Sequence, residues 1–131
     1  MNRMLSPWAF IILLFFVPSA DARIIRVPQD APEISEAISA TQNSDTVLVS
    51  PGLWLGKPGQ GGLGVSGKNI TIASLFLTTQ DSSYIAGTII KRNGDLPTIT
   101  FGAGVDSTTV LCGLTIQNES SWDWGAVRCV S

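Results

Sequence analysis

Residues 67–94 read GKNITIASLFLTTQDSSYIAGTIIKRNG and contain two runs typical of β-strands. The runs are NITIASLF (69–76) and GTIIKR (87–92), both rich in β-branched residues. The polar segment between them shows no helical period and no tight-turn dipeptide, so a hairpin that pairs the two runs is not expected. Short strands joined by long polar connections predict either a sandwich with long loops or a coil that stacks on itself.

Repeats along the chain favour the coil. Further strand runs are TVLV (46–49), TITF (98–101), TTVLCGLTI (108–116) and AVRCV (126–130). The pattern of residues 71–77 returns 39 residues later at 110–116, and TVLV, TIIK and AVRC recur at intervals of 42 and 38. Recurring strand types are typical of a solenoid, whereas a sandwich has no reason to repeat them. We therefore expect NITIAS to lie beneath TVLCG, and GTIIKR beneath AVRCV, each one turn further on.

The segment before these runs predicts the one helix of the fold. After a short strand at 24–27, the sequence APEISEAISAT places Ile34, Ala37 and Ile38 at helical spacing, which gives one apolar stripe. Pro32 suits the first turn of such a helix. From the strand at 46–49 onward no helical period recurs, and the glycine-rich segment 56–67 is predicted to be a flexible inserted loop.

The order strand, short amphipathic helix and DTVLVSPG (45–52) resembles the N-terminal cap and first turn of right-handed parallel β-helix proteins of the pectin lyase-like superfamily. GKNITIASLFLTT, DSSYIAGTII and DSTTVLCGLTIQN look like the following turns in secreted bacterial members of that group. The resemblance covers residues 23–131 and marks the fold better than the activity. It implies an all-β, right-handed parallel β-helix with a short N-terminal capping helix.

The helix is expected to plug the first turn, in preference to the alternative of a partner-binding element, because terminal units of a solenoid need a polar-backed cover. The opposite end has no such cover, since the sequence stops in mid-strand at AVRCVS. We therefore expect a fold truncated at the C-terminus, from a shortened reading frame or as the first piece of a longer protein.

Residues 1–22 have the pattern of a signal peptide. Arg3 precedes the apolar run WAFIILLFFV (8–17), and the small residues Ala20 and Ala22 frame a cleavage site. Cleavage after Ala22 predicts a secreted or cell-surface protein of residues 23–131, free of the membrane once the leader is removed. The alternative is an uncleaved N-terminal anchor.

Cys112 and Cys129 are the two cysteines of the chain. In an oxidising compartment they could form a disulfide, which would close a loop of about 17 residues and add about 3 kcal/mol. The alternative is that both are small buried hydrophobic residues in the core.

Composition excludes several kinds of chemistry. The net charge of −2 and the lack of a basic run argue against nucleic-acid binding. No histidine is present, so histidine triads and histidine-ligated metals are excluded, and no phosphate-binding glycine loop, cofactor motif or metal-ligand pattern is recognised. Asp81 and Asp106 begin similar D-S-S and D-S-T segments, which favours turn capping over catalysis. No catalytic residue is assigned, and whether the chain is an enzyme stays open.

Tryptophans are the candidate binding residues. Trp122 and Trp124 in SSWDWG would share one face of a strand and form a flat platform for a sugar, with Asp123 on the other face, and Trp54 is a further candidate. The alternative is that these rings cover an apolar edge. Asn69 and Asn118 fit a glycosylation pattern, but we expect them to stack or cap strand ends.

These observations predict a secreted or cell-surface β-helix module that is non-catalytic as it stands and presents a face to polysaccharide or to a cell-surface partner. The alternative is the N-terminal part of a polysaccharide lyase, hydrolase or pectin esterase whose catalytic turns lie beyond residue 131.

Overall fold

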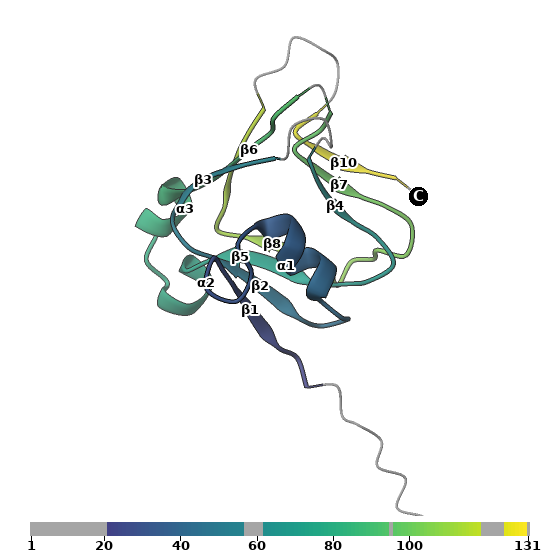
Figure 1. Cartoon of the computed structure of the whole chain (residues 1–131), viewed down its shortest axis with the longest axis horizontal. Helices are drawn as coiled ribbons and strands as arrows, with labels where there is room; N and C mark the ends of the chain where they lie inside the picture. The colour runs from purple at the N-terminus through teal and green to yellow at the C-terminus, as the bar shows by residue number, and fades with distance from the viewer. Residues whose placement is uncertain (1–20, 57–61, 95, 119–124, 131) are drawn as a thin grey trace, which may run out of the picture.

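The computed structural model describes residues 21–56, 62–94, 96–118 and 125–130. Ten strands and three short helices in these ranges are arranged in three parallel sheets. Figure 1 shows the sheets as three walls around a shared interior, with α1 (Ile34–Ala40) lying over it. The fold is the right-handed parallel β-helix that the sequence predicts.

The first sheet contains one strand from each successive turn of the coil. In order across the sheet, its strands are β1 (Ile24–Val27), β2 (Thr46–Val49), β5 (Thr71–Ser74) and β8 (Val110–Cys112). Thr71 is in register with Val110, which is the 39-residue repeat found in the sequence. The prediction that NITIAS lies beneath TVLCG is confirmed.

The other two sheets correct part of the repeat analysis. The second sheet is β3 (Gly52–Leu55), β6 (Thr88–Lys91) and β9 (Thr115–Gln117), and the third is β4 (Leu63–Val65), β7 (Ile99–Phe101) and β10 (Val127–Cys129). β6 pairs with β9, and β10 pairs with β7, so the prediction that GTIIKR lies beneath AVRCV is wrong. TVLV, TIIK and AVRC belong to three different sheets and look alike because all three sheets line one apolar interior.

The turns also differ in length, which explains the misleading intervals. Ile24 pairs with Thr46, 22 residues on, and Thr46 pairs with Thr71, 25 residues on. The third turn is longer because the polar connection after β5 contains α2 (Phe76–Thr79) and α3 (Ser83–Gly87). The expectation that no helix follows residue 49 is therefore wrong, since helices of four and five residues are too short to show a helical period.

A further correction concerns residues 52–65. The sequence predicts no strand there and a flexible loop over 56–67, but the structure contains β3 and β4 within this segment. Pairing with β6 and β7 supplies the order that the glycines do not predict, since parallel partners satisfy the backbone groups of both strands.

The core is built from inward-facing positions stacked from turn to turn. Ile25, Val47, Ile72 and Leu111 form one such ladder in the first sheet, and the first three are buried. Gly113, with φ of +66°, forms the corner between β8 and β9, where a Cβ would lie 2.8 Å from Phe76 Cβ.

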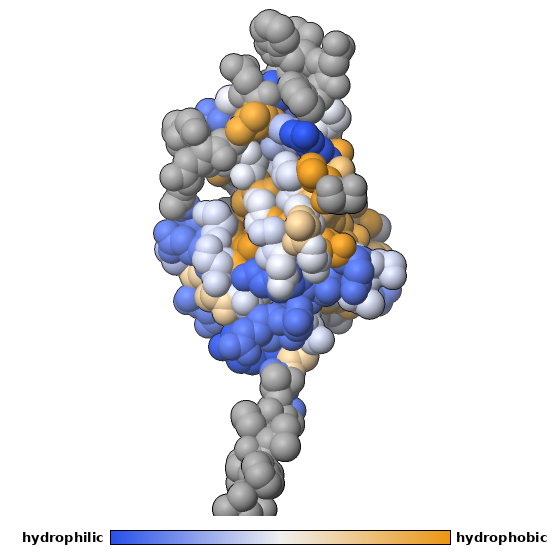
Figure 2. Space-filling model, turned by 90° about the vertical axis from the view of Figure 1, so that its right-hand side faces the viewer, coloured by the Kyte–Doolittle hydropathy of each residue, from blue (hydrophilic) through white to orange (hydrophobic). Residues whose placement is uncertain are grey.

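Outward-facing positions are more varied in character. Figure 2 views the molecule from the side of the third sheet and shows apolar patches in the upper half of this face and hydrophilic surface in the lower half. Leu53 and Leu55 on β3 point outward and are each 58% exposed.

Helix α1 covers one end of the interior, as the sequence predicts. Its stripe of Ile34, Ala37 and Ile38 is buried, and the helix contacts β1, β2 and β4. Lys68 from the next turn donates hydrogen bonds to the carbonyls of Ile38 and Thr41 at the C-terminal end of the helix. A cation at these carbonyls is favoured by the helix dipole. The helix is therefore held on the coil both by its apolar stripe and by the hydrogen bonds of Lys68.

Candidate functional site

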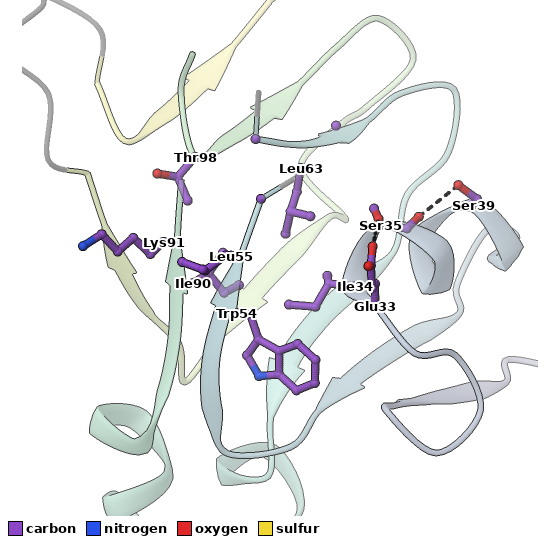
Figure 3. Close-up of a pocket in the computed structure, with 13 residues that line it drawn as sticks. Glu33, Ile34, Ser35, Ser39, Trp54, Leu55, Leu63, Ile90, Lys91 and Thr98 are labelled. Atoms are coloured by element: carbon purple, nitrogen blue, oxygen red, sulfur yellow. Dashed lines mark hydrogen bonds between the residues drawn. The ribbon is translucent and has the colours of Figure 1, made fainter. Parts of the chain in front are cut away.

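A pocket of about 280 Å³ lies between α1 and the neighbouring walls formed by β3, β4 and β6. Figure 3 shows the residues that line it, with the helix on one side and strands on the other. The pocket exists because α1 is only seven residues long and covers part of the coil's end. Its volume is near the lower limit for small-molecule sites, so it fits a group about the size of one sugar ring.

The inner surface of the pocket is apolar. Trp54 on β3 is in register with Ile90 on β6, and both take the inward positions of their strands. Ile34 from α1 and Leu63 from β4 point toward the same space (Figure 3). The indole N–H of Trp54 donates to the carbonyl oxygen of Ser50 at 2.9 Å, which fixes the ring orientation.

Polar groups line the helix side and the far wall. Ser39 Oγ donates to the carbonyl oxygen of Ser35 at 2.9 Å, and Ser35 Oγ lies 3.5 Å from a carboxylate oxygen of Glu33. Thr98 Oγ1 donates to the carbonyl oxygen of Gln117 at 3.1 Å, which leaves its lone pairs as acceptors. The Lys91 side chain borders the pocket and points away from α1 (Figure 3).

An aromatic ring, aliphatic side chains and several hydroxyl groups can hold a ligand that has both an apolar face and hydroxyl groups. Among the lining residues, which all lie in the described ranges, Glu33 is the one carboxylate. Glycoside hydrolysis needs two carboxyl groups on opposite sides of the reacting bond. The pocket therefore suits binding better than hydrolysis.

Of the residues predicted to bind a sugar, the structure describes only Trp54. Trp54 is half-buried and lines the pocket, where it also packs against the core, so it combines the binding and covering roles weighed from the sequence. Trp122, Asp123 and Trp124 lie outside the described residues. The sugar platform that they would form stays a prediction.

Both cysteines are free thiols in the structure. Cys129 on β10 is exposed and lines a second cavity, whereas Cys112 on β8 is half-buried and takes the strand face opposite to the inward Leu111. Neither is a buried core residue, contrary to the second alternative. The disulfide stays a prediction.

Asp81 and Asp106 cap turns, as their sequence contexts predict. Asp81 Oδ1 accepts the N–H of Ser83 at 2.9 Å, and Asp106 Oδ1 accepts the hydroxyl and the N–H of Thr108 at 2.6 and 2.8 Å. The backbone and side-chain hydrogen bonds of Ser83 lower the pKa of Asp81 below its usual value. The side-chain and backbone hydrogen bonds of Thr108 likewise lower the pKa of Asp106.

Asn69 joins three turns of the coil. Its N–H donates to Asn43 Oδ1 at 2.9 Å, and its own Oδ1 accepts the N–H of Asp106 at 2.7 Å and the hydroxyl of Thr109 at 2.8 Å. Of the two roles predicted for Asn69, stacking or capping at strand ends, the hydrogen bonds confirm capping. Asn118 directly follows β9, and its capping role stays a prediction.

Asp45 is a structural residue that sequence reasoning missed. Its carboxylate accepts hydrogen bonds from the N–H of Gln42 at 2.8 Å and from the N–H and the guanidinium of Arg23, both at 2.9 Å. Burial would raise the pKa of Asp45, but these hydrogen bonds and the guanidinium charge outweigh it and lower the pKa below its usual value. The only sign of this role in the sequence is the position of Asp45 directly before the strand run TVLV (46–49).

The polar side of the pocket was also missed. Ser35 and Ser39 are four residues apart, so they lie on one helix face beside the apolar stripe. That spacing is visible in the sequence, but only the position of β3 and β4 shows that this face borders a pocket.

In the part of the chain that the structure describes, no group of three or more Cys, Asp or Glu residues could hold a metal ion. No helix among the described residues is long and apolar enough to cross a membrane. Comparisons of the chain with protein-family models, with curated proteins and with solved structures find no match.

Proposed function

We propose that this chain is a secreted or cell-surface β-helix module that binds polysaccharide without cleaving it, with the pocket beside α1 holding one sugar unit. The observation that carries the proposal is the pocket lining, which combines the aromatic side chain of Trp54 with the hydroxyl-bearing residues Ser35 and Ser39. Sugars stack their C–H faces on aromatic rings and exchange hydrogen bonds with hydroxyl groups, so the pocket matches both surfaces of a sugar.

Assignment to the pectin lyase-like superfamily is part of this proposal. It is supported by the DTVLVSPG sequence after a capping helix, together with three parallel sheets that stack turn upon turn. An anionic polysaccharide is one ligand to include in a test, because Lys91 is the one basic residue among those that line the pocket.

The test compares two adjacent positions of α1. Ser39 lines the pocket, whereas Ala40 is exposed on the same helix and does not. Ser39→Trp should fill the pocket and weaken binding to a purified polysaccharide by at least about tenfold, which corresponds to about 1.4 kcal/mol. Ala40→Trp should leave the affinity unchanged.

Binding is measured by affinity electrophoresis against a panel of neutral and uronic-acid polysaccharides, and folding of each variant by its urea midpoint. Equal affinities of Ser39→Trp and the unmodified chain would place the binding elsewhere and contradict the pocket assignment. Failure of the unmodified chain to bind any polysaccharide of the panel would contradict the proposed function itself.

A further inference from the structure

The backbone nitrogen of Arg23 points at a buried carboxylate. It donates to Asp45 Oδ1 at 2.9 Å, and the side chain of Asp45 is only 2% exposed. The other oxygen, Oδ2, accepts the N–H of Gln42 at 2.8 Å and the Arg23 guanidinium at 2.9 Å. These bonds fix the orientation of the carboxylate and direct Oδ1 at the Arg23 nitrogen.

Arg23 is also the residue at which the chain joins the coil. Its carbonyl oxygen accepts the N–H of Thr46 at 2.8 Å, and its guanidinium donates to the carbonyl oxygen of Ala40 at 3.0 Å, at the C-terminal end of α1. Asp21 and Ala22, directly before it, are exposed. A chain that begins at Arg23 would therefore keep these hydrogen bonds to the second turn and to the helix.

The same residue follows the cleavage site expected from the sequence. Hydrolysis of the Ala22–Arg23 peptide bond by a signal peptidase adds one water molecule, which leaves a carboxylate on Ala22 and an amine on Arg23. The usual pKa of an α-amino group is about 8, so this amine takes up a proton at neutral pH. Cleavage thus replaces the neutral N–H that faces Asp45 with an ammonium group.

We propose that Asp45 is the binding site for the α-ammonium group that leader removal creates at Arg23, and that this ion pair stabilises the first turn and its cap. The site depends on the secretion part of the proposed function, since only cleavage produces the amine, but it needs no polysaccharide. A charged donor bonds a carboxylate more strongly than a neutral donor does, and burial of Asp45 limits screening by salt. Because Asp45 lies between α1 and β2, the ion pair holds β1 to the segment that follows the cap.

The first experiment compares two chains that differ by one residue at the N-terminus. Each is released from a fusion protein by a protease that leaves no extra residue, so one begins at Arg23 and the other at Ala22. The longer chain keeps the neutral N–H of Arg23 at Asp45 and carries its ammonium group one residue away. The described core begins at Ile25, so neither chain loses a core residue. In urea unfolding, the chain that begins at Arg23 should have an unfolding equilibrium constant at least about tenfold smaller, which corresponds to about 1.4 kcal/mol.

The matched control is the same pair of chains with Asp45→Asn. The amide group keeps the shape of the carboxylate but not its charge, so the difference in stability between the two chains should disappear. A difference of equal size in the Asp45→Asn pair, or no difference in the unmodified pair, would overturn the proposal.

A second measurement needs no substitution. The α-amine of each chain is acylated near neutral pH with an activated ester, and the N-terminal peptide is quantified by mass spectrometry. The reaction should be at least about tenfold slower at Arg23 than at Ala22, because pairing with Asp45 keeps the amine protonated. Equal rates would show that the amine does not bind the carboxylate and would overturn the proposal.

The N-terminus of the exported chain distinguishes failure of this site from failure of the proposed function. The chain produced with its leader in a secreting bacterial host should have the mass of residues 23–131. Another N-terminus or a retained leader would overturn the proposal and contradict secretion, whereas sugar binding by the pocket is tested separately with Ser39→Trp. Equal stability of the two chains, with cleavage before Arg23, would overturn the ammonium site alone.

Discussion

Equivalent inward positions are buried to different extents in the middle of this coil and in its last described turn. Ile72 and Leu111 occupy the same inward ladder of the first sheet, yet Ile72 is fully buried and Leu111 is only half-buried. At the α1 end the helix stripe and Lys68 cover the interior, whereas β8, β9 and β10 at the other end are the last strands of their sheets among the described residues. Burial in a solenoid therefore depends on the neighbouring turn more than on the residue itself.

The largest expected effect on the free energy of unfolding comes from truncating Ile72, and truncating Leu111 provides the comparison. Ile72→Ala should lower the free energy of unfolding by about 4 kcal/mol, because the surrounding ladder cannot collapse onto the cavity. Leu111→Ala should cost only about 1 to 2 kcal/mol, because its side chain is only half-buried. Urea unfolding measures both. Equal losses would show that the last described turn is packed as tightly as the middle. If Ile72→Ala does not fold, Ile72→Val should still cost about 1 kcal/mol.

The next prediction concerns the hydrogen bonds that Asp45 makes at the α1 end of the coil. Asp45→Asn should cost about 2 kcal/mol at neutral pH, because the amide group cannot accept all the hydrogen bonds from Gln42 and Arg23. The lowered pKa of Asp45 also fixes a pH dependence. The stabilising carboxylate is fully charged above the usual Asp pKa of about 4, and its contribution is lost as pH falls through the lower folded-state pKa.

Urea midpoints measured between neutral and acidic pH check this sign. The unmodified chain should lose stability on acidification, and Asp45→Asn should lose less over the same interval. A steeper acid loss in Asp45→Asn than in the unmodified chain would contradict the assigned direction of the pKa shift.

The third prediction concerns the hydrogen bonds by which Asn69 stabilises the turn that contains β8. Asn69→Ala removes the acceptor for the N–H of Asp106 and the hydroxyl of Thr109, and should cost about 1.5 kcal/mol. Amide hydrogen exchange should quicken in β8 more than in β1. Asn43→Ala removes only the acceptor for the N–H of Asn69, so it serves as the matched control with a smaller effect at β8. Uniform acceleration across both strands would argue against a local role.

The smallest expected effect concerns the cap. Lys68→Met keeps the aliphatic stem but removes the ammonium group from the carbonyls of Ile38 and Thr41, at a cost of about 1 kcal/mol. Arg26→Met removes an exposed pair with Asp30 at 3.9 Å and should cost less than about 0.5 kcal/mol. Urea unfolding of the two variants gives the comparison, and equal values would show that Lys68 does not hold the helix.

The part of the fold that depends on alternation and helical spacing was predictable. The stripe of α1, the strand at 46–49 and the register of β5 with β8 all follow from patterns that each strand carries alone. The assignment of strands to sheets failed because the three walls enclose one interior and have similar sequences. The glycine-rich β4 was missed because its order comes from its partner β7.

The candidate site was predictable only at Trp54. The sequence marks this residue as a large aromatic side chain beside a turn, but the partners Ser35, Glu33 and Leu63 come from a helix and a strand on either side of it. Their convergence depends on how far α1 extends over the interior, which is a property of the packed coil.

The sequence by itself determined the class of fold, the capping role of α1 and the turn-capping roles of Asp81 and Asp106, because these depend on periodicity and on hydrogen bonds between near neighbours. Only the tertiary structure decided which strands share a sheet and where the pocket lies. These features depend on contacts between residues that are far apart in the chain, and local sequence patterns do not specify such contacts.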